Sequence, residues 1–364
     1  MLYRNKIVAA CLLTILLSPA AFSQEQAGAR EKHQLLALPV ISRSIETDWG
    51  FGGAASYTFH LSGRDSFTRT SNMQAVSYYT LKRQFLAALD GTIYFPKEKY
   101  ILSSHLSYSY YPDQFWGIGR KTPERGKEPY SFRQCYVYLH GQRLIAHQVF
   151  LGLIYSYQNL IGLRYRPGGL FDQQQVTGRT PYHVSGLGFS LSYDRRNNTF
   201  APDHGELLLV SFSHYDKLLA SDFRYANLIL DFRKYWPVFR RQVLAAQAYG
   251  FFNSGLVPFM SLASLGGSET MRGYYDGRFR DKNLIVLQTE YRFPVWWRFG
   301  AVLFAGAGDV AHRLDNFNLL NLKYSGGAGI RFAVRPREKM NIRLDYGIGQ
   351  GRQNGFYLQF GEAF

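Results

Sequence analysis

Cysteine is nearly absent from this chain of 364 residues, which holds only Cys11 and Cys135. Cys11 lies in an apolar run near the start that we interpret as part of a cleaved signal, so one cysteine remains and an intrachain disulfide is excluded. Long apolar runs are missing too, because no stretch after residue 23 reaches the roughly 18 consecutive apolar residues of a transmembrane helix. The sequence therefore excludes both a disulfide scaffold and a helical membrane protein.

Motifs of catalysis and metal binding are missing as well. The chain has no Gly-x-Ser-x-Gly elbow and no His-Glu-x-x-His pair, and its nine histidines are scattered without the spacing of metal ligands. His105 shares one face of a predicted strand with Ser103, Ser107 and Ser109, where a hydrogen-bonded wall residue is the simpler interpretation. We predict a protein that is not an enzyme, with no catalytic residue, no metal and no cofactor.

The first 23 residues have the order of a secretory signal. Basic residues open it, an apolar run follows over 7–17, and Ala21-Phe22-Ser23 supplies the cleavage site. We therefore predict a signal peptide over 1–23 and a single barrel domain over 24–364.

Acidic residues are in deficit. The 42 Lys and Arg outnumber the 26 Asp and Glu, which gives a formal net charge of +16. An exported chain seldom meets nucleic acid, so we expect none as a partner and expect anionic lipid or lipopolysaccharide headgroups as the counter-charge. The basic loop with Arg120, Lys121, Arg125 and Lys127 has two open interpretations: a grip on lipopolysaccharide phosphates, or a solvated extracellular loop.

Aromatic residues and glycine are abundant, with 27 Tyr, 28 Phe and 35 Gly. The pattern after residue 34 has a period of two. In Met340–Ile348, every second residue is apolar, and the residues between them are Asn341, Arg343, Asp345 and Gly347. Side chains alternate between the two faces of a strand, so each such strand separates an apolar medium from a polar one. The composition and the alternation together predict an all-β, transmembrane antiparallel barrel.

About sixteen such runs follow one another along the chain. They lie near residues 36–44, 49–61, 72–82, 84–95, 100–111, 130–142, 145–158, 184–194, 205–216, 222–236, 241–253, 283–294, 297–309, 323–334, 339–349 and 354–364.

The lengths of the connections support that count. The long ones, at 112–129, 159–183, 254–282 and 310–322, all follow odd-numbered runs. Bacterial barrels place long loops outside the cell and short turns in the periplasm, so an even number of strands puts all four on one side. A soluble β-sandwich is the alternative, but it would need no aromatic bands.

The connection at 254–282 is the longest polar interval of the second half. Loops of this length inside a tightly connected β-chain are often functional. Arg272 stands between glycine turns and aromatic residues, a setting in which a guanidinium can seek a carboxylate. Two interpretations stay open from the residues alone: a loop folded onto another part of the molecule, or a solvated surface loop.

Several stretches resemble one family, the BamA/TamA-like outer-membrane proteins of the bacterial surface-antigen superfamily. The connection after residue 193 resembles the family's periplasmic turn and supplies Asp194, Arg195, Asn197, Pro202 and Gly205. The long loop resembles the family's inserted loop through Gly266, Gly267, Met271, Arg272, Gly273 and Tyr274. The last run resembles the family's final strand and barrel signal, with Phe356, Phe360 and Phe364.

The resemblance implies that the extracellular loop folds into the lumen of a sixteen-stranded barrel, where Arg272 pairs with acids on the wall. Glu290, on the strand after the loop, is placed for this role, and Asp309 and Asp345 are further candidates. The sequence departs from the family at two points. Glycine replaces the aspartate usually found in the next strand, at position 306, and Met271 replaces a valine or isoleucine.

The resemblance also bears on partners. It implies a place in the lipid bilayer of a Gram-negative type outer membrane and insertion by the barrel-assembly machinery. Full members carry periplasmic POTRA modules that receive client chains. Only about eleven residues separate Gln24 from the first run, so we expect a short form without them.

Three functions stay open. The first is a factor for envelope protein or lipid assembly or transport, acting by a weak seam between the first and last strands. The second is a gated, basic-lined pore for small anions. The third is a surface or adhesion protein that presents its loops.

Overall fold

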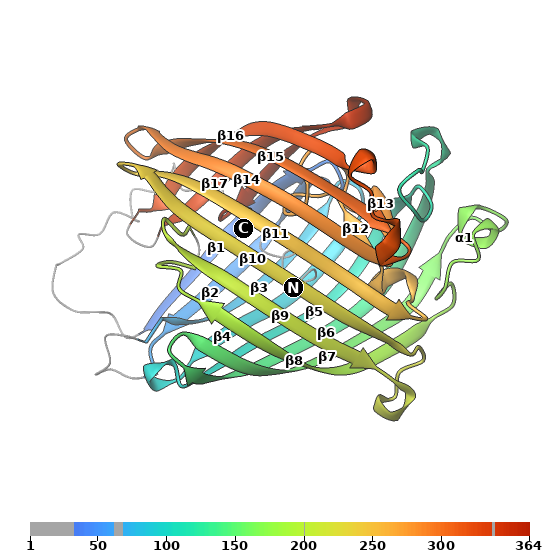
Figure 1. Cartoon of the computed structure of the whole chain (residues 1–364), viewed down its shortest axis with the longest axis horizontal. Coiled ribbons are helices and arrows are strands. Elements are labelled where there is room, and N and C mark those ends of the chain that lie inside the picture. Colours follow the sequence, from blue (N-terminus) through green and yellow to red (C-terminus); the bar gives the residue numbers. More distant parts are fainter. Residues whose placement is uncertain (1–32, 62–67, 200, 337–338) are drawn as a thin grey trace.

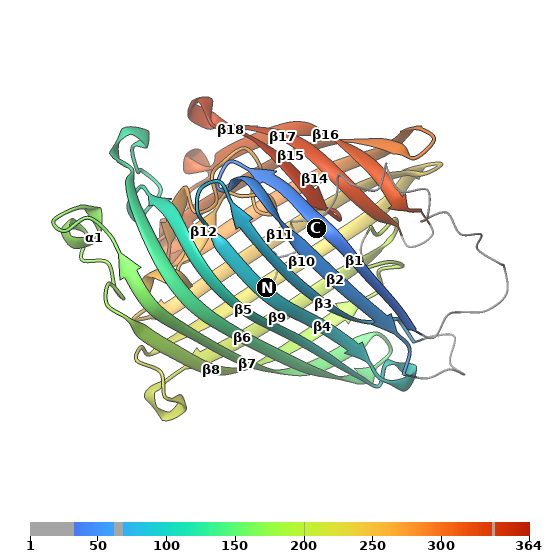
Figure 2. The same cartoon turned by 180° about the vertical axis from the view of Figure 1, so that it is seen from behind.

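The computed structural model describes residues 33–61, 68–199, 201–336 and 339–364, so the predicted signal peptide lies outside the described residues. Sixteen strands form one closed antiparallel barrel, and two short strands form a hairpin inside the longest loop. Figures 1 and 2 show the tilted strands of the barrel from opposite sides. The prediction of an all-β barrel with about sixteen strands is confirmed.

The barrel strands lie close to the predicted runs. They are β1 (His33–Ser44), β2 (Asp48–Phe59), β3 (Ser71–Thr80), β4 (Phe85–Tyr94), β5 (Tyr100–Phe115), β6 (Glu128–Ala146), β7 (Val149–Arg164), β8 (Tyr182–Asp194), β9 (Gly205–Tyr215), β10 (Tyr225–Phe239), β11 (Gln242–Gly255), β14 (Asn283–Trp296), β15 (Phe299–Ala311), β16 (Lys323–Arg335), β17 (Met340–Gly349) and β18 (Asn354–Phe360).

Each barrel strand pairs with the barrel strands that come before and after it in the chain, so that β11 pairs with β14. The strands β1 and β18 pair with each other and close the ring. The ladders between consecutive strands extend over most of their length; β17 and β18, for example, pair from Ile342 with Phe360 to Ile348 with Asn354. At the closure the register among the described residues has one pair, Arg43 with Leu358. The barrel therefore has one short seam, and it lies between its first and last strands.

The two faces of each strand differ as the alternation predicts. On β14, Leu287 is 60% exposed whereas Glu290 is fully buried. On β17, Leu344 is exposed whereas its neighbours Arg343 and Asp345 are buried. A closed barrel has one interior, so these buried polar rows line it and the exposed apolar rows face the membrane. Of the residues that the structure describes, none belongs to a helix that is long and apolar enough to cross a bilayer.

The four long connections lie at one end of the barrel, as the strand parity predicts. They are now bounded as residues 116–127, 165–181, 256–282 and 312–322, and α1 (Leu170–Gln173) is part of the second. We call this the loop end and the opposite one the turn end. Figure 1 shows α1 and the β12–β13 hairpin together at the loop end.

Some predicted boundaries are wrong. The predicted runs at 130–142 and 145–158 imply a turn between them, but β6 continues to Ala146 and the chain reverses at His147 and Gln148. Gly141 is an exposed residue of β6, and a Cβ there would meet no atom within 4 Å, so this glycine marks a lipid-facing position and not a bend. The last run was expected to reach residue 364, but β18 ends at Phe360.

Candidate functional site

The longest loop folds back on itself before it meets the barrel wall. A short hairpin of β12 (Ala263–Leu265) and β13 (Phe279–Asp281) brings its two halves together. The tip between them turns at Gly266 and Gly267, whose φ angles are 120° and 90°. A Cβ on Gly266 would lie 1.9 Å from the main-chain oxygen of Tyr275, so only glycine fits there.

Arg272 leaves this tip and is buried against the interior face of three strands. Its Nη1 donates to Oδ2 of Asp345 on β17 at 2.5 Å, and its Nη2 donates to Glu290 on β14. The guanidinium also lies over the ring of Phe304 on β15, 3.6 Å from the ring centroid. A buried arginine with two carboxylates and an aromatic face has its charge and its donors satisfied.

Asp309 does not hold Arg272 as expected, and this is a correction. Its carboxylate lies 3.0 Å from Nη1 of Arg120, an arginine of the 116–127 loop. Asp309 pairs in register with Ile285, whereas Glu290 pairs with Phe304. Five residues of strand, roughly 17 Å, therefore separate the height of Asp309 from that of Glu290, which is too far for one arginine to span.

The two departures from the family pattern meet in space. A Cβ at Gly306 would lie 2.9 Å from the sulfur of Met271, so the larger side chain of the loop occupies the room that a side chain on β15 would need. The amide of Met271 donates to the side-chain oxygen of Gln288 at 3.2 Å. Methionine at 271 and glycine at 306 thus compensate for each other in volume.

The arginine of the loop belongs to a larger charge cluster that the sequence analysis did not predict. The cluster has four arginines and four acids, all on the interior side: Arg272, Arg292, Arg331, Arg343, Glu269, Glu290, Asp345 and Glu362. Its positive and negative groups are equal in number, so the charge of this cluster is balanced. We call it the interior charge cluster. The alternation along each strand puts Glu290, Arg292, Arg331, Arg343 and Asp345 on polar faces, but which of them meet depends on the register between strands.

Glu269 is a second point at which the loop enters this cluster. Its carboxylate lies 2.7 Å from Nη2 of Arg343 on β17. Burial raises the pKa of Glu269 above its ordinary value, and the facing Arg343 opposes that shift. The loop therefore offers one cation and one anion to opposite charges on the wall.

The segment after β18, residues 361–364, also turns into the barrel, and we call it the tail segment. Gly361 has a φ of 80°, which redirects the chain. Glu362 accepts from Nε of Arg331 at 2.7 Å, and the main-chain oxygen of Phe364 accepts from Arg292 at 3.0 Å. Phe364 is buried with Tyr235 and other residues of β10 and β11. Phe356 faces the membrane, and the side chain of Phe360 lies outside the described parts of the chain.

Gly273 and Tyr274 complete the contact of the loop with the wall. The amide of Gly273 donates to the hydroxyl of Tyr357 at 3.0 Å, and the hydroxyl of Tyr274 donates to the main-chain oxygen of Tyr324 at 2.8 Å. Gly273 has a φ of 109°, and a Cβ on it would lie 2.7 Å from the carbonyl carbon of Ile348. The backbone of the loop therefore packs directly on that of β17.

The same loop is tied to the first hairpin near the loop end. The amide of Asp276 donates to Glu46, in the turn between β1 and β2, at 2.8 Å. Burial raises the pKa of Glu46 to about 7, and the nearby Asp276 adds to this rise, while a hydrogen bond from Ser44 opposes it. The hydroxyl of Tyr275 donates to Asp113 on β5 at 2.7 Å. The first contact ties the loop to the turn beside β1, a strand of the seam, and the second ties it to β5.

The predicted turn motif closes β8 and β9 at the turn end. Asp194 accepts from Arg196 at 2.9 Å, and the side chain of Asn197 accepts from the amide of Asp203 at 3.0 Å. Arg195 lies 3.7 Å from Glu206, and Pro202 is buried. Gly205 has a φ of 102°, and a Cβ there would lie 2.2 Å from the main-chain oxygen of Arg195. The motif residues thus form one compact turn, far along the strands from Arg272.

The loop leaves a cavity of about 170 Å³ on the β6–β11 side of the interior. Hydroxyl and amide side chains such as Ser156, Gln158 and Asn227 line it, with Glu269 and Arg280 among the charged residues. Its lining is mostly neutral, unlike the basic lining that the pore hypothesis expected. His105 on β5 lies 2.8 Å from Asp90 and 3.1 Å from Ser107, so it is a hydrogen-bonded wall residue.

Both the sequence and the fold of this chain are similar to those of known proteins. The sequence signature of the Omp85 superfamily domain matches residues 50–364. Among curated protein sequences, none matches the chain significantly. The fold is similar to that of BamA from Haemophilus ducreyi lacking POTRA domains 1–3, with a TM-score of 0.57 and 14% identity over 91% of this chain and 70% of that one. It is also similar to CdiB from Acinetobacter baumannii, with a TM-score of 0.62 and 12% identity over 92% of this chain and 60% of that one. CdiB from Escherichia coli is similar as well, with a TM-score of 0.59 and 12% identity over 92% of this chain and 63% of that one.

Proposed function

Because this chain belongs to the Omp85 superfamily, we propose that it acts in the assembly or transport of proteins or lipids at the outer membrane, through the seam between β1 and β18. The observation that carries this proposal is the length of that seam. One register pair joins its strands among the described residues, whereas adjacent ladders run over most of their strands. A ladder with few hydrogen bonds costs little to open.

The seam exposes strand edges that a client can use. An unpaired strand edge presents a row of N–H and C=O groups and is a template for another strand. Pro39 in β1 has no N–H to donate, which also limits pairing within this strand. In this proposal a client strand, or a lipid, leaves or enters the barrel wall between β1 and β18.

The role of the loop in the proposal is to close the lumen. Arg272 and Glu269 bind the wall, while Asp276 binds the turn beside β1. A loop held at both of these places keeps the interior filled on the β14–β18 side, so that opening of the seam does not open a pore through the membrane.

A lock across the seam tests the proposal. In a Cys135→Ser background, Arg43→Cys and Leu358→Cys place two cysteines at the register pair. The protein is reconstituted in liposomes, and the insertion of a urea-unfolded eight-stranded barrel is followed by its heat-dependent gel shift. We expect faster insertion than in empty liposomes, loss of that gain on oxidation, and its return on reduction.

A matched control completes this test. A second pair of cysteines, at Ile342 and Phe360 in the β17–β18 ladder, locks a seam that is already paired and leaves the gain unchanged. If the oxidised Arg43–Leu358 lock inserts the probe as fast as the reduced form does, the seam is not the route and the proposal is wrong.

A pore for small solutes is the second candidate, and the cavity beside the loop favours it. Its neutral lining predicts weak selectivity between anions and cations. Steady conductance of the intact barrel in planar bilayers would support this candidate over a closed barrel that opens only at its seam.

A further inference from the structure

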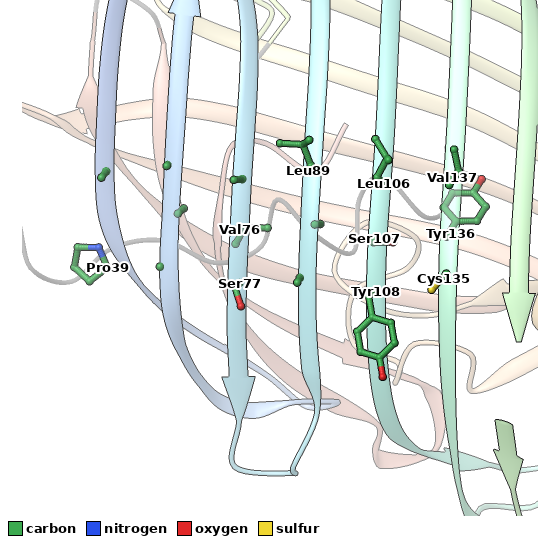
Figure 3. A pocket seen from close by; sticks show the side chains of 17 residues that line it. Pro39, Val76, Ser77, Leu89, Leu106, Ser107, Tyr108, Cys135, Tyr136 and Val137 are labelled. Atoms are coloured by element: carbon green, nitrogen blue, oxygen red, sulfur yellow. The ribbon is translucent and has the colours of Figure 1, made fainter. Parts of the chain in front are cut away.

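The membrane face of the barrel has a shallow groove next to the seam, across β1–β6. Two adjacent rows of outward residues, joined by the register of the ladders, form its floor. Pro39 pairs with Gly53, Gly53 with Ser77, and Ser77 with Ala87. In the next row, Ala37 pairs with Ala55, and Ala55 with Ala75. Small residues on four neighbouring strands thus leave a space of about 1000 Å³ (Figure 3).

Large side chains border this floor on the remaining sides. Toward the loop end, the next row holds Phe51, Tyr79 and Phe85. Toward the turn end, the row holds Tyr57 and Met73. Leu89, Leu106 and Tyr108 stand at the β5 side, as Figure 3 shows. The groove is therefore a depression in an otherwise bulky apolar surface.

Basic residues lie along the border of the groove that faces the loop end. Arg43 is about half exposed, and its guanidinium lies 5.3 Å from the ring centroid of Trp49 and 3.9 Å from the half-exposed carboxylate of Asp48. Arg133 is exposed on β6, where it continues the row of Phe51, Tyr79 and Phe85. Its guanidinium lies over the ring of Tyr110. Arg83 is exposed in the turn between β3 and β4. An apolar groove with a cationic upper border is complementary to an acylated anion.

We propose that this groove binds a phosphorylated, multiply acylated glycolipid of the outer leaflet, the chemistry of the lipid A part of lipopolysaccharide. Bacterial barrels direct their long loops outward, which places the basic border at the outer leaflet. Arg43 lies four residues closer to the loop end than Pro39, roughly 13 Å along the strand. This distance is about half of the ~25 Å height of the apolar band of such barrels. Acyl chains then lie on the small-residue floor while phosphates meet Arg43, Arg83 and Arg133.

The ligand follows from this geometry. Ordinary phospholipid carries one phosphate, whereas the three arginines span β1 to β6, five strand spacings or roughly 24 Å. A headgroup with two separated phosphates and several chains uses the whole border. The proposal rests on the membrane position of the barrel and not on the use of the seam for clients, so each can fail alone.

Lipid retention tests the proposal. The full-length protein in detergent is mixed with equal amounts of diphosphorylated lipid A, monophosphorylated lipid A and phosphatidylethanolamine, and bound lipids are identified by native mass spectrometry. We expect preferential retention of the diphosphorylated lipid. Arg43→Gln and Arg133→Gln each reduce that preference about five-fold, the effect of one basic residue near an anionic surface. Arg313→Gln, in an exposed loop, is the control.

The floor is tested by filling it. A Cβ at Gly53 would meet no atom within 4 Å, so Gly53→Phe adds bulk without disturbing the barrel, which its heat-dependent gel shift verifies. We expect this variant to lose most of the bound lipid A, and Ala305→Phe, on the exposed face of β15, to retain it. Equal retention by Gly53→Phe, or equal retention of phosphatidylethanolamine and lipid A, overturns the proposal. A dimer that Gly53→Phe abolishes would assign the groove to a second copy instead and also overturn it.

Discussion

Glu362 accepts from Arg331 at 2.7 Å, and this ion pair fixes the tail segment inside the barrel. The direction of the tail explains the short seam. A segment bound to β16 in the interior cannot extend β18 along β1. The part of β1 toward the turn end is therefore left without that partner. Glu362 therefore does two things at once: it joins the interior charge cluster, and it draws the tail segment away from the ladder that would close the wall.

Removal of the loop arginine should open the barrel. Arg272→Ala leaves Glu290 and Asp345 buried without this cation, which costs about 3–5 kcal/mol of stability. We expect single-channel conductance in planar bilayers to rise from nearly closed to open, and Glu290→Ala to behave alike. Asp90→Ala removes the contact of Asp90 with His105 between β4 and β5 and should leave the conductance unchanged. Steady conduction by the intact barrel, unaffected by either change, would contradict a lumen-closing loop.

The tail segment should be released by loss of its charge. With Cys135→Ser and Ala363→Cys, the buried cysteine reports the docked tail through slow maleimide labelling. Glu362→Gln weakens its hydrogen bond to Arg331, and buried hydrogen bonds to charged groups contribute about 1.5–3 kcal/mol. We expect labelling at least about ten-fold faster. Phe356→Ala, on the membrane face, should change nothing, and an unchanged rate in Glu362→Gln would show that the ion pair does not hold the tail.

A methyl group at Gly273 should displace the loop. The residue has a φ of 109° and packs on the backbone of β17, so Gly273→Ala adds a steric clash to the backbone strain of about 1–3 kcal/mol. Gly119→Ala is a matched control, because its φ is 107° and no atom lies within 4 Å of its Cβ. We expect hydrogen exchange in residues 266–276 to speed up at least ten-fold in the first variant and little in the second. Equal effects would mean that only the backbone strain matters.

The attachment of the loop to the first hairpin should depend on pH through Glu46. The buried carboxyl keeps its proton up to a pKa of about 7, whereas in a solvated, undocked loop it loses the proton near the ordinary value of 4.5. The docked state therefore binds more protons between these values, and docking weakens as pH rises from about 4.5 to about 7. Hydrogen exchange of residues 266–276 between pH 5 and 8 measures this. Glu46→Gln should remove the dependence, and an identical pH profile in that variant would refute the role of Glu46.

Much of this architecture can be read from the residues themselves. The alternation in Met340–Ile348 defines β17 and its two faces, because a strand at a membrane boundary has no other way to satisfy both media. Glu290 and Asp345 could be placed on the interior side for the same reason. Gly266 and Gly267 mark the turn of the loop, since their conformations are closed to other residues.

The remainder depends on contacts between distant parts of the chain. The height of Asp309 relative to Glu290 follows from the register of β14 and β15, which no single strand encodes, and so its pairing with Arg120 was missed. The inward turn at Gly361 was missed because residues 354–364 continue an alternating pattern. The ion pair of Glu362 that overrides that pattern lies with a residue of another strand.

The interior charge cluster also sets an order of assembly. Arg272 and Asp345 are 73 residues apart in the chain, and Gly273 and Tyr357 are 84 apart. Such distant contacts form late, because the entropy of closing the intervening chain is lost before they can stabilise anything. Until β17 and the tail segment arrive, the arginines and acids of β14 and of the loop face water. A nascent barrel of this protein therefore keeps these charged groups hydrated, and the paired interior charge cluster is a product of the final folding step.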